Sequence, residues 1–265
     1  MISIVAMRPD APPVSASPRV ANSQVGRVVL TLRKMILRGN FRPGERIAEI
    51  AVAARLKASR TPVRLALDRL AHEALLEPQP TGGFRVREFA VADIWDAIEI
   101  RGVLEGTAAR LAAERRTDPG DLALLRQCCE EQERALPTEL QEFVRYFELN
   151  DAFHRGLWRL AKSPILERTM ETVIALPFAA PSALLFSPSD ARERRNAALV
   201  AIDQHRSIVD AIEHQEGTRA ESLAREHTRI ARRNLMDALQ NSELFRRMPG
   251  ASLVRMPAPR EANRA

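Results

Sequence analysis

The order of predicted elements in residues 25–87 constrains the fold of this chain more than any other feature. Apolar residues recur at helical spacing over residues 25–37, and Gly39 ends that stretch. A turn then leads to a second, short helix over residues 47–56 and a third helix over residues 60–74. Helices this closely spaced predict a small helical module at the start of the chain.

The residues that follow the third helix predict a β-hairpin. Two short runs, residues 75–79 and 84–87, flank the turn sequence Pro80-Thr81-Gly82-Gly83. Three helices followed by a hairpin is the element order of a winged helix-turn-helix. We therefore expect residues 23–90 to form such a DNA-binding domain.

The rest of the chain is predicted to be helical, so the expected fold class is mainly α. Apolar periodicity, with Pro- or Gly-containing breaks, places six helices over residues 92–116, 120–136, 139–161, 164–185, 192–215 and 218–240. Pro177 and Pro181 are expected to kink or split the fourth of these helices. Residues 91–242 are thus expected to form an all-helical bundle.

The two ends of the chain have a different composition. Residues 1–22 and 243–265 contain prolines among small or charged residues, which predicts a flexible arm and a flexible tail. The first residues lack the pattern of a secretion signal, and no apolar run approaches the ~20 residues of a membrane span. Cys128 and Cys129 are adjacent, which does not suggest a disulfide framework. We expect a cytoplasmic protein without membrane contact.

Charge is distributed unevenly along the chain, whose net charge is +6. Residues 1–90 carry 15 Lys or Arg against 7 Asp or Glu, whereas residues 91–242 carry 20 against 25. A basic first third joined to an acidic body favours contact of the first part alone with a polyanion. An arginine-rich composition common to many proteins of one organism would give the same surplus, and charge alone does not separate the two interpretations.

The third predicted helix begins with the strongest functional motif, Ser59-Arg60-Thr61-Pro62-Val63-Arg64, whose first residue is a favourable N-cap. Arg60, Thr61 and Arg64 lie near the helix N-terminus on adjacent faces, while Val63 points the other way. Such a turn can enter the major groove, where Arg bridges guanine N7 and O6 and hydroxyls bind phosphate. Taken alone, the helix would be better explained as an amphipathic surface helix with solvated arginines.

The residues around this motif closely resemble the DNA-binding domain of the GntR family. The matching positions are Leu32, Ile36, Gly39, Pro43-Gly44-Glu45-Arg46, Leu56, the motif itself, Leu67, Leu70 and Gly82-Gly83-Phe84-Arg85-Val86. The resemblance implies DNA contacts from Ser59, Arg60, Thr61 and Arg64, and from a wing tip at Gly82 and Gly83. Some relatives place an arginine where this chain has Ile50, which leaves Arg46 or Arg55 as substitutes for that contact.

A second resemblance, to the FCD sensor domain that follows many GntR modules, covers most of residues 93–240. It is carried by Arg101-Gly102-Val103-Leu104-Glu105, by Asn150-Asp151-Ala152-Phe153-His154, and by His205 and His227. The resemblance implies a helical domain that binds a small-molecule effector. Arg101 is the candidate partner of an effector carboxylate. Its i, i+4 spacing equally allows an ion pair with Glu105.

The spacing of the histidines can be argued independently of the family. Asn150 and His154 are four residues apart and share one helix face. His205 and His227 come from two other predicted helices and could converge with that pair inside a bundle. His214 lies half a rotation from His205, so both cannot point inward.

The FCD resemblance also implies a divalent metal held by three histidines and an Asp four residues before the first of them. In this chain Asn150 takes the place of that Asp, and Asp151 is rotated ~100° away on the helix. An amide oxygen binds a divalent cation less well than a carboxylate does. We expect Asn150, His154, His205 and His227 to hold one ion, zinc before others. A metal-free sensor whose histidines bind the effector directly is the open alternative.

Together these features predict a transcription regulator rather than an enzyme. The expected form is a homodimer that binds a short inverted repeat, because one recognition helix reads only a few base pairs. A repressor controlled by a small organic acid is the expected mode of action. A metal-dependent hydrolase is the remote alternative, since a histidine-lined metal with an open position can activate water. No recognisable nucleophile or general-base motif accompanies these histidines.

Overall fold

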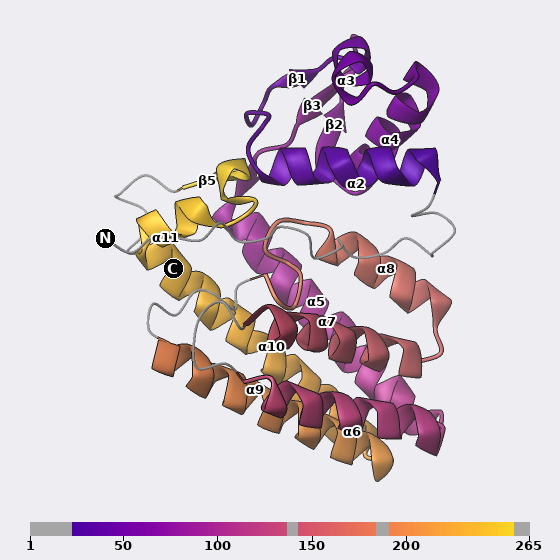
Figure 1. Ribbon diagram of the computed structural model, residues 1–265. Coiled ribbons are helices and arrows are strands. Elements are labelled where there is room, and N and C mark those ends of the chain that lie inside the picture. Colours follow the sequence, from indigo (N-terminus) through magenta and orange to yellow (C-terminus); the bar gives the residue numbers. More distant parts are fainter. Residues whose placement is uncertain (1–22, 137–142, 184–190, 257–265) are drawn as a thin grey trace.

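The computed structural model describes residues 23–136, 143–183 and 191–256. The expected arm over residues 1–22 lies outside this part, as does the end of the expected tail, residues 257–265. Figure 1 shows a small module at one end of the molecule and a larger bundle of helices below it. Among the residues described, no helix combines the length and the apolar character needed to cross a membrane.

The small module is a winged helix-turn-helix, as predicted. It consists of α2 (Gln24–Leu37), β1 (Arg46–Ile47), α3 (Glu49–Leu56), α4 (Arg60–His72), β2 (Leu76–Pro78) and β3 (Phe84–Val86). The strands form one antiparallel sheet in the order β1-β3-β2. The predicted hairpin therefore gains a third strand, β1, which the sequence pattern had assigned in part to the second helix. A two-residue strand is too short to show the alternation by which strands are predicted.

The core of this module forms on the inward faces of α2 and α4. Its most deeply buried side chains are Leu32, Ile36, Val63, Leu67, Leu70 and Leu75. Ser23 caps α2, because its hydroxyl oxygen accepts a hydrogen bond from the Gly26 amide at 3.0 Å. The rigid packing of α4 against α2 fixes the direction in which the N-terminal turn of α4 faces solvent.

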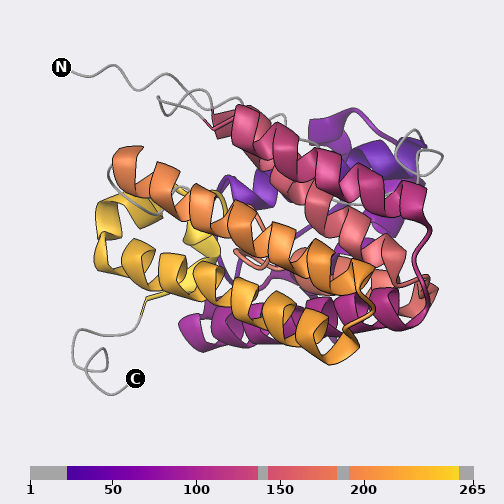
Figure 2. The same cartoon turned by 90° about the horizontal axis from the view of Figure 1, so that it is seen from below.

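The larger module is a helical bundle. Its helices are α5 (Val91–Glu114), α6 (Pro119–Arg134), α7 (Phe143–Leu160), α8 (Pro164–Ile174), α9 (Ala191–Glu213) and α10 (Gly217–Gln240). Figure 2 shows α10 between α9 and α5, and α10 packs along both of them. The fourth predicted helix is shorter than expected: α8 ends at Ile174, and turns follow to residue 183. The residue before a proline avoids helical geometry, so Pro177 and Pro181 end the helix rather than kink it.

Two glycines allow α5 and α10 to approach closely. A Cβ atom at Gly106 would lie 2.7 Å from Cγ of Arg225 and 3.0 Å from the carbonyl oxygen of Glu221. At Gly102 the nearest atom, Cβ of Thr228, would lie at 3.2 Å. A larger side chain at either position would push the two helices apart.

The sequence-based prediction of a flexible tail from Glu243 is wrong for residues 243–256. Residues 242–256, which we call the C-terminal strap, form α11 (Ser242–Arg247), the 3-10 turn η2 (Ala251–Leu253) and β5 (Val254–Arg255). β5 pairs in parallel with β4 (Phe89–Ala90), the strand that precedes α5. A six-residue helix followed by single apolar residues has no period to detect, so only the tertiary packing reveals this segment.

Candidate functional site

The N-terminal turn of α4 faces solvent at one end of the winged helix module. Ser59, Arg60, Thr61 and Arg64 are exposed, while Val63 on the opposite face is fully buried. Ser59 occupies the N-cap position, but its side chain makes no capping hydrogen bond. The first amides of a helix have no partner within the helix, and they favour an anion. This turn therefore presents hydroxyls, guanidinium groups and amides together, a combination suited to phosphate and base edges.

Arg60 is held in place by an acidic residue of the preceding helix. Its Nε lies 3.3 Å from Oε1 of Glu49, and 70% of the Arg60 side chain is exposed. An ion pair this exposed contributes little to stability. Arg60 can therefore exchange Glu49 for a phosphate or a base at small cost.

The wing tip depends on two glycines and one arginine. Gly82 and Gly83 both have φ of +83°, in the left-handed region that glycine adopts without strain. Arg46 donates a hydrogen bond from Nη2 to the carbonyl oxygen of Gly82 at 2.7 Å. Arg55 lies over the ring of Phe41, with Cζ 5.7 Å from the ring centre. Arg46 and Arg55, the two substitutes for the arginine that Ile50 replaces, thus have structural partners of their own.

In the helical module, three histidines from three helices meet in the interior. His154 of α7, His205 of α9 and His227 of α10 are buried, and each offers a ring nitrogen within 4.8 Å of those of the others. The two Nε2 atoms of His205 and His227 lie 3.1 Å apart. The ring of Phe153 stacks on His205 with ring centres 3.8 Å apart.

The Nδ1 atom of each histidine faces a side-chain oxygen. His205 Nδ1 lies 2.9 Å from Oε1 of Gln132, and His227 Nδ1 lies 2.9 Å from Oε1 of Gln204. His154 Nδ1 lies 2.9 Å from Oε1 of Glu105. An imidazole that donates through Nδ1 keeps Nε2 free as a ligand, which is the arrangement common at metal sites. Sequence reasoning missed all three of these oxygen partners as parts of the site.

Asn150 and Asp151 are linked by one hydroxyl group. Asn150 donates a hydrogen bond from Nδ2 to Oγ of Ser182 at 3.1 Å, and Ser182 donates to Oδ1 of Asp151 at 2.7 Å. Ser182 belongs to the turns that follow α8. Asn150 therefore lies one helical turn from His154, with its amide orientation set by Ser182.

Arg101 and Glu105 form the charged part of this interior. Both side chains are nearly inaccessible, 2% and 1% exposed, and Arg101 Nε lies 3.9 Å from Oε1 of Glu105. Arg101 donates from Nη1 to the carbonyl oxygen of Ala179 at 2.8 Å. The ion pair that the i, i+4 spacing allowed is thus present. Contact with an effector carboxylate remains a proposal for Arg101.

Several polar atoms at this point have unmet hydrogen-bonding capacity. Within the part of the chain described, Arg101 Nε, Glu105 Oε1 and His154 Nδ1 are buried without a well-aligned hydrogen bond. The contact of 2.9 Å between Oε1 of Glu105 and Nδ1 of His154 is therefore close but not aligned as a hydrogen bond. Buried groups of this kind are costly unless a ligand or an ion completes their interactions.

Burial and neighbouring charge set the protonation of the interior. Burial, followed by the effect of His154, lowers the pKa of His227 to about 3. Burial and the neighbouring His227 also hold the pKa of His205 well below its usual value. For Glu105, burial alone would raise the pKa, but His154 and Arg101 lower it to about 2. The site thus contains an ionised carboxylate and at least two neutral imidazoles, which is the form that binds metals.

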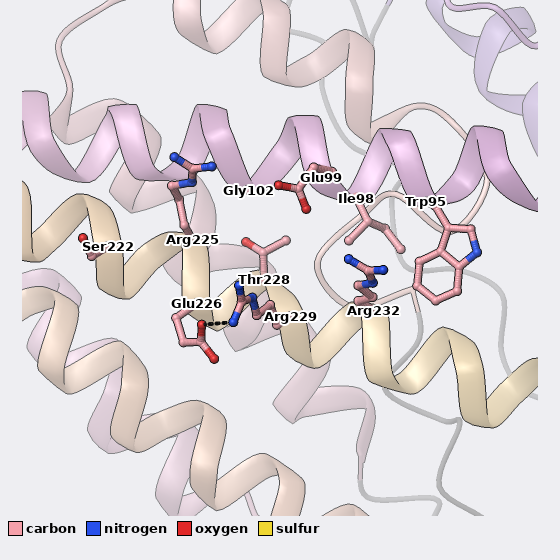
Figure 3. Close-up of a pocket in the computed structure, with 10 residues that line it drawn as sticks. All are labelled: Trp95, Ile98, Glu99, Gly102, Ser222, Arg225, Glu226, Thr228, Arg229 and Arg232. Atoms are coloured by element: carbon pink, nitrogen blue, oxygen red, sulfur yellow. Dashed lines mark ion pairs between the residues drawn. The ribbon is translucent and has the colours of Figure 1, made fainter. Parts of the chain in front are cut away.

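A groove between α5 and α10 has a different character. It encloses about 270 Å³ between α5 and α10, and Figure 3 shows Trp95 and Arg232 at one end and Arg225 at the other. None of the three histidines lines this groove. It meets the interior at Thr228, whose hydroxyl donates to Oε2 of Glu105 at 3.4 Å. The histidine cluster and this groove are therefore separate features of the helical module.

A winged helix-turn-helix joined to a helical bundle with a buried polar centre defines a class of DNA-binding regulators with a separate sensor domain. The chain belongs to the gntR family of bacterial regulatory proteins, whose sequence pattern matches residues 24–86. Residues 96–229 match the FCD domain. The family assignment made from the sequence is confirmed.

Named relatives of the chain are transcription regulators, not enzymes. The Nta operon transcriptional regulator of Aminobacter aminovorans is 38% identical over 134 residues, which are 51% of this chain and 62% of that protein. This match thus spans less than two thirds of that relative's length. A probable D-xylose utilization operon transcriptional repressor of Paenarthrobacter nicotinovorans is 31% identical over 72% of this chain and 80% of that protein.

Among solved structures, E. coli McbR/YncC has a similar fold. The TM-score is 0.59, with 24% sequence identity over 83% of this chain and 99% of that chain. The likeness supports the mainly α fold and the order of the two modules. It carries no information about the ligands of this chain.

Proposed function

We propose that this GntR-family regulator is a repressor, and that a small carboxylate bound at a divalent metal in the helical module releases it from its operator. The observation that carries the proposal is the interior of that module. Three histidines direct ring nitrogens at one another, and unsatisfied polar atoms of Arg101, Glu105 and His154 lie beside them. An apolar core would not gather these groups, because each costs free energy when it is buried without a partner.

The donor set fits a divalent metal. Neutral imidazoles suit zinc and related ions, and Nδ1 of His205 and Nδ1 of His227 each lie 2.9 Å from an oxygen acceptor. We assign His154, His205 and His227 as ligands and Asn150 as the source of a fourth, its amide oxygen. When bound, the metal would supply an open position for an anionic oxygen of the effector.

Arg101 is the proposed partner of the effector carboxylate. Its Nε is buried and has no aligned hydrogen bond among the described residues, while its Nη1 binds the carbonyl oxygen of Ala179. A carboxylate that reached Arg101 would compete with that carbonyl group, because guanidinium groups bind carboxylates more strongly than neutral oxygens. Binding would therefore disturb the turns after α8, to which Ala179 belongs.

At the other end of the molecule, Ser59, Arg60, Thr61 and Arg64 of α4, with Gly82 and Gly83 of the wing, are the proposed DNA contacts. We propose a homodimer on a short inverted repeat, since one exposed α4 turn reads too few base pairs for useful specificity. The repressor role is supported by the Paenarthrobacter relative, which is named as a probable transcriptional repressor, and by the ease with which a bound dimer blocks a promoter.

The test begins with the purified full-length protein. Metal analysis should find about one divalent ion per chain, or added zinc should raise the melting temperature by mass action. A double variant, His205→Ala with His227→Ala, should abolish that effect, whereas His72→Ala, at an exposed position in the winged helix module, should retain it. If neither metal content nor stabilisation by zinc, nickel or manganese is found, the sensor is metal-free. A thermal-shift screen of small organic acids then decides whether the histidines bind an effector directly.

A further inference from the structure

Gln132 connects α7 to the buried histidine of α9. Its side chain is fully buried on α6, between α7 and α9. Its Nε2 donates a hydrogen bond to the carbonyl oxygen of Leu149 at 3.0 Å, and its Oε1 lies 2.9 Å from Nδ1 of His205. A carbonyl oxygen can only accept, so Leu149 fixes which end of the amide faces the histidine.

The orientation of Gln132 decides where His205 carries its proton. Because Oε1 of Gln132 can only accept, Nδ1 of His205 must be the donor. A neutral His205 then has a bare Nε2, which lies 3.1 Å from Nε2 of His227. From this geometry we infer that Gln132 is a positioning residue that holds His205 in the metal-binding tautomer, an inference that rests on the metal site proposed above.

Nuclear magnetic resonance can test the tautomer in the metal-free protein. Long-range proton–nitrogen spectra of the imidazole rings distinguish a protonated ring nitrogen from a bare one. We expect Nδ1 of His205 to be protonated in the wild type and in Gln127→Leu, a control at an exposed position on the same helix. In Gln132→Leu the acceptor is gone, so a mixture of tautomers or the Nε2–H form should replace it. Zinc affinity should then fall about 10- to 100-fold, as is usual for the partners of ligating histidines.

A second variant separates a positioning role from a packing role. Gln132→Glu, which in its protonated form can donate to the carbonyl oxygen of Leu149 and accept from Nδ1 of His205, should restore the Nδ1–H form of His205. A wild-type His205 protonated at Nε2, or an unchanged spectrum in Gln132→Leu, would overturn the inference. Because the spectrum requires no bound metal, a failure of zinc binding in the wild type would count against the metal proposal and leave this measurement intact.

The C-terminal strap supports a second, independent inference. Leu253 of the strap is fully buried in the core of the winged helix module. Phe245 packs with the end of α10, and its ring stacks on Phe178 with ring centres 5.2 Å apart. Gly250 donates its amide hydrogen to the carbonyl oxygen of Leu37, the last residue of α2, at 2.8 Å. The strap thus contacts both modules and lies against the turns that follow α8.

These contacts connect the strap to the buried polar centre. Phe178 precedes Ala179, whose carbonyl oxygen accepts the hydrogen bond from Arg101. α10, which carries His227, is separated from α11 of the strap by one residue, Asn241. A shift of the turns after α8 or of α10 would therefore reach α2 and β4 through this segment. We infer that the strap couples the helical module to the DNA-binding module.

Calorimetry and hydrogen exchange test this coupling without any ligand. Coupled modules unfold in one transition, so the wild type and Met256→Ala, at an exposed position, should each show a single peak. A chain ending at Asn241 and the variant Leu253→Ser should show two peaks, with faster amide exchange in α2. A single peak in the truncated chain, or two peaks in the wild type, would contradict the inference. Leu253→Ser retains the rest of the strap, so it remains informative if the truncated chain does not fold.

Discussion

At the scale of single residues, the buried pair Arg101 and Glu105 is poorly arranged for stability. Removing two charges from water costs several kcal/mol for each ion, and only good geometry with complete hydrogen bonding offsets that cost. Here the two groups lie 3.9 Å apart, and each has a buried atom without an aligned hydrogen bond. Hydrophobic residues of similar volume at these two positions would cost less free energy to bury. The pair therefore makes more sense as part of a binding site than as a stabilising contact.

A first prediction concerns the residue that replaces the usual aspartate. Asn150→Asp should tighten zinc binding about tenfold or more, because a carboxylate binds a divalent cation better than an amide oxygen. Asp151→Asn is the matched control, since its amide oxygen can still accept from Ser182, and it should change affinity little. Competition titration against a chromogenic chelator measures the zinc affinity of both variants. Equal affinities for Asn150→Asp and the wild type would show that position 150 is not a ligand.

A second prediction follows from the pKa values of the buried histidines. The pKa of His227 is about 3 in the native protein, against 6.5 for an unperturbed histidine, and the pKa of His205 is lowered as well. At a pH between about 3 and 6.5, the unfolded chain therefore binds more protons than the native protein does. The unfolding free energy of the metal-free protein should therefore be highest above pH 6.5 and fall as the pH drops toward 3, by about 1.4 kcal/mol per pH unit for each fully buried histidine.

Urea unfolding in the presence of a chelator, at intervals between pH 7 and pH 5, measures this slope. His227→Asn removes one of the two titrating groups and should make the slope shallower. The same slope in that variant and in the wild type would show that His227 titrates normally in the folded protein.

At the scale of elements, long periodic helices could be predicted and short elements could not. The positions of α5, α6, α9 and α10 follow from apolar spacing, with proline and glycine at the breaks. β1 and the strap were missed, because two-residue strands and a six-residue helix are held by tertiary contacts alone. Their stability comes from the neighbours they pack against, which a local pattern does not contain.

In the buried polar centre, the sequence likewise predicted pairs of residues within one helix but not contacts between helices. The i, i+4 pair Asn150 and His154 is visible in the sequence, as is the pair Arg101 and Glu105. The contact between His154 and Glu105, by contrast, depends on how α7 is rotated against α5. The same holds for Gln132 and its partner on α9. No spacing within one helix encodes the rotation of another.

A third prediction concerns the recognition helix. Arg64 is exposed on the first turns of α4, so Arg64→Ala should cost about 1–3 kcal/mol of operator affinity and relax specificity at one base pair. Arg46→Ala is the matched comparison, because Arg46 braces the wing through Gly82. It should weaken binding without changing base preference at that position. Selection from random DNA, followed by competition binding, compares the base preference and the operator affinity of the two variants. Equal loss on specific and random DNA for Arg64→Ala would make Arg64 a phosphate contact instead.

At the scale of the whole molecule, charge and packing assign separate tasks to the two modules. Residues 1–90 carry the excess of basic residues, and residues 91–242 carry an excess of acidic ones. A polyanion is therefore attracted to the winged helix end and repelled by the bundle. The buried polar centre lies in the bundle, away from any direct contact with DNA. An effector bound there can change operator affinity only through the elements that join the two modules.

The elements that join the two modules couple them through direct packing rather than through long-range electrostatics. β4 leads directly into α5, which carries Arg101 and Glu105, and β5 of the strap pairs with β4. Residues 89–91, which join the two modules, thus form a paired strand and the start of a helix, not a loose connection. A ligand that shifts α5 or the turns after α8 should then shift the winged helix with them. Allosteric coupling of this type is commonly about 1–3 kcal/mol, which is about 5- to 150-fold in affinity.

Reciprocity gives the last prediction its test. If a small carboxylate from the thermal-shift screen weakens operator binding by some factor, saturating operator DNA must weaken binding of that carboxylate by the same factor. Isothermal titration of the acid into free protein and into the protein–operator complex measures the second factor, and competition binding on DNA measures the first. Leu253→Ser should reduce both factors toward unity, while Met256→Ala should leave both unchanged. Equal affinity of the acid with and without operator would show that the two modules act independently, because any real coupling has to appear from both sides.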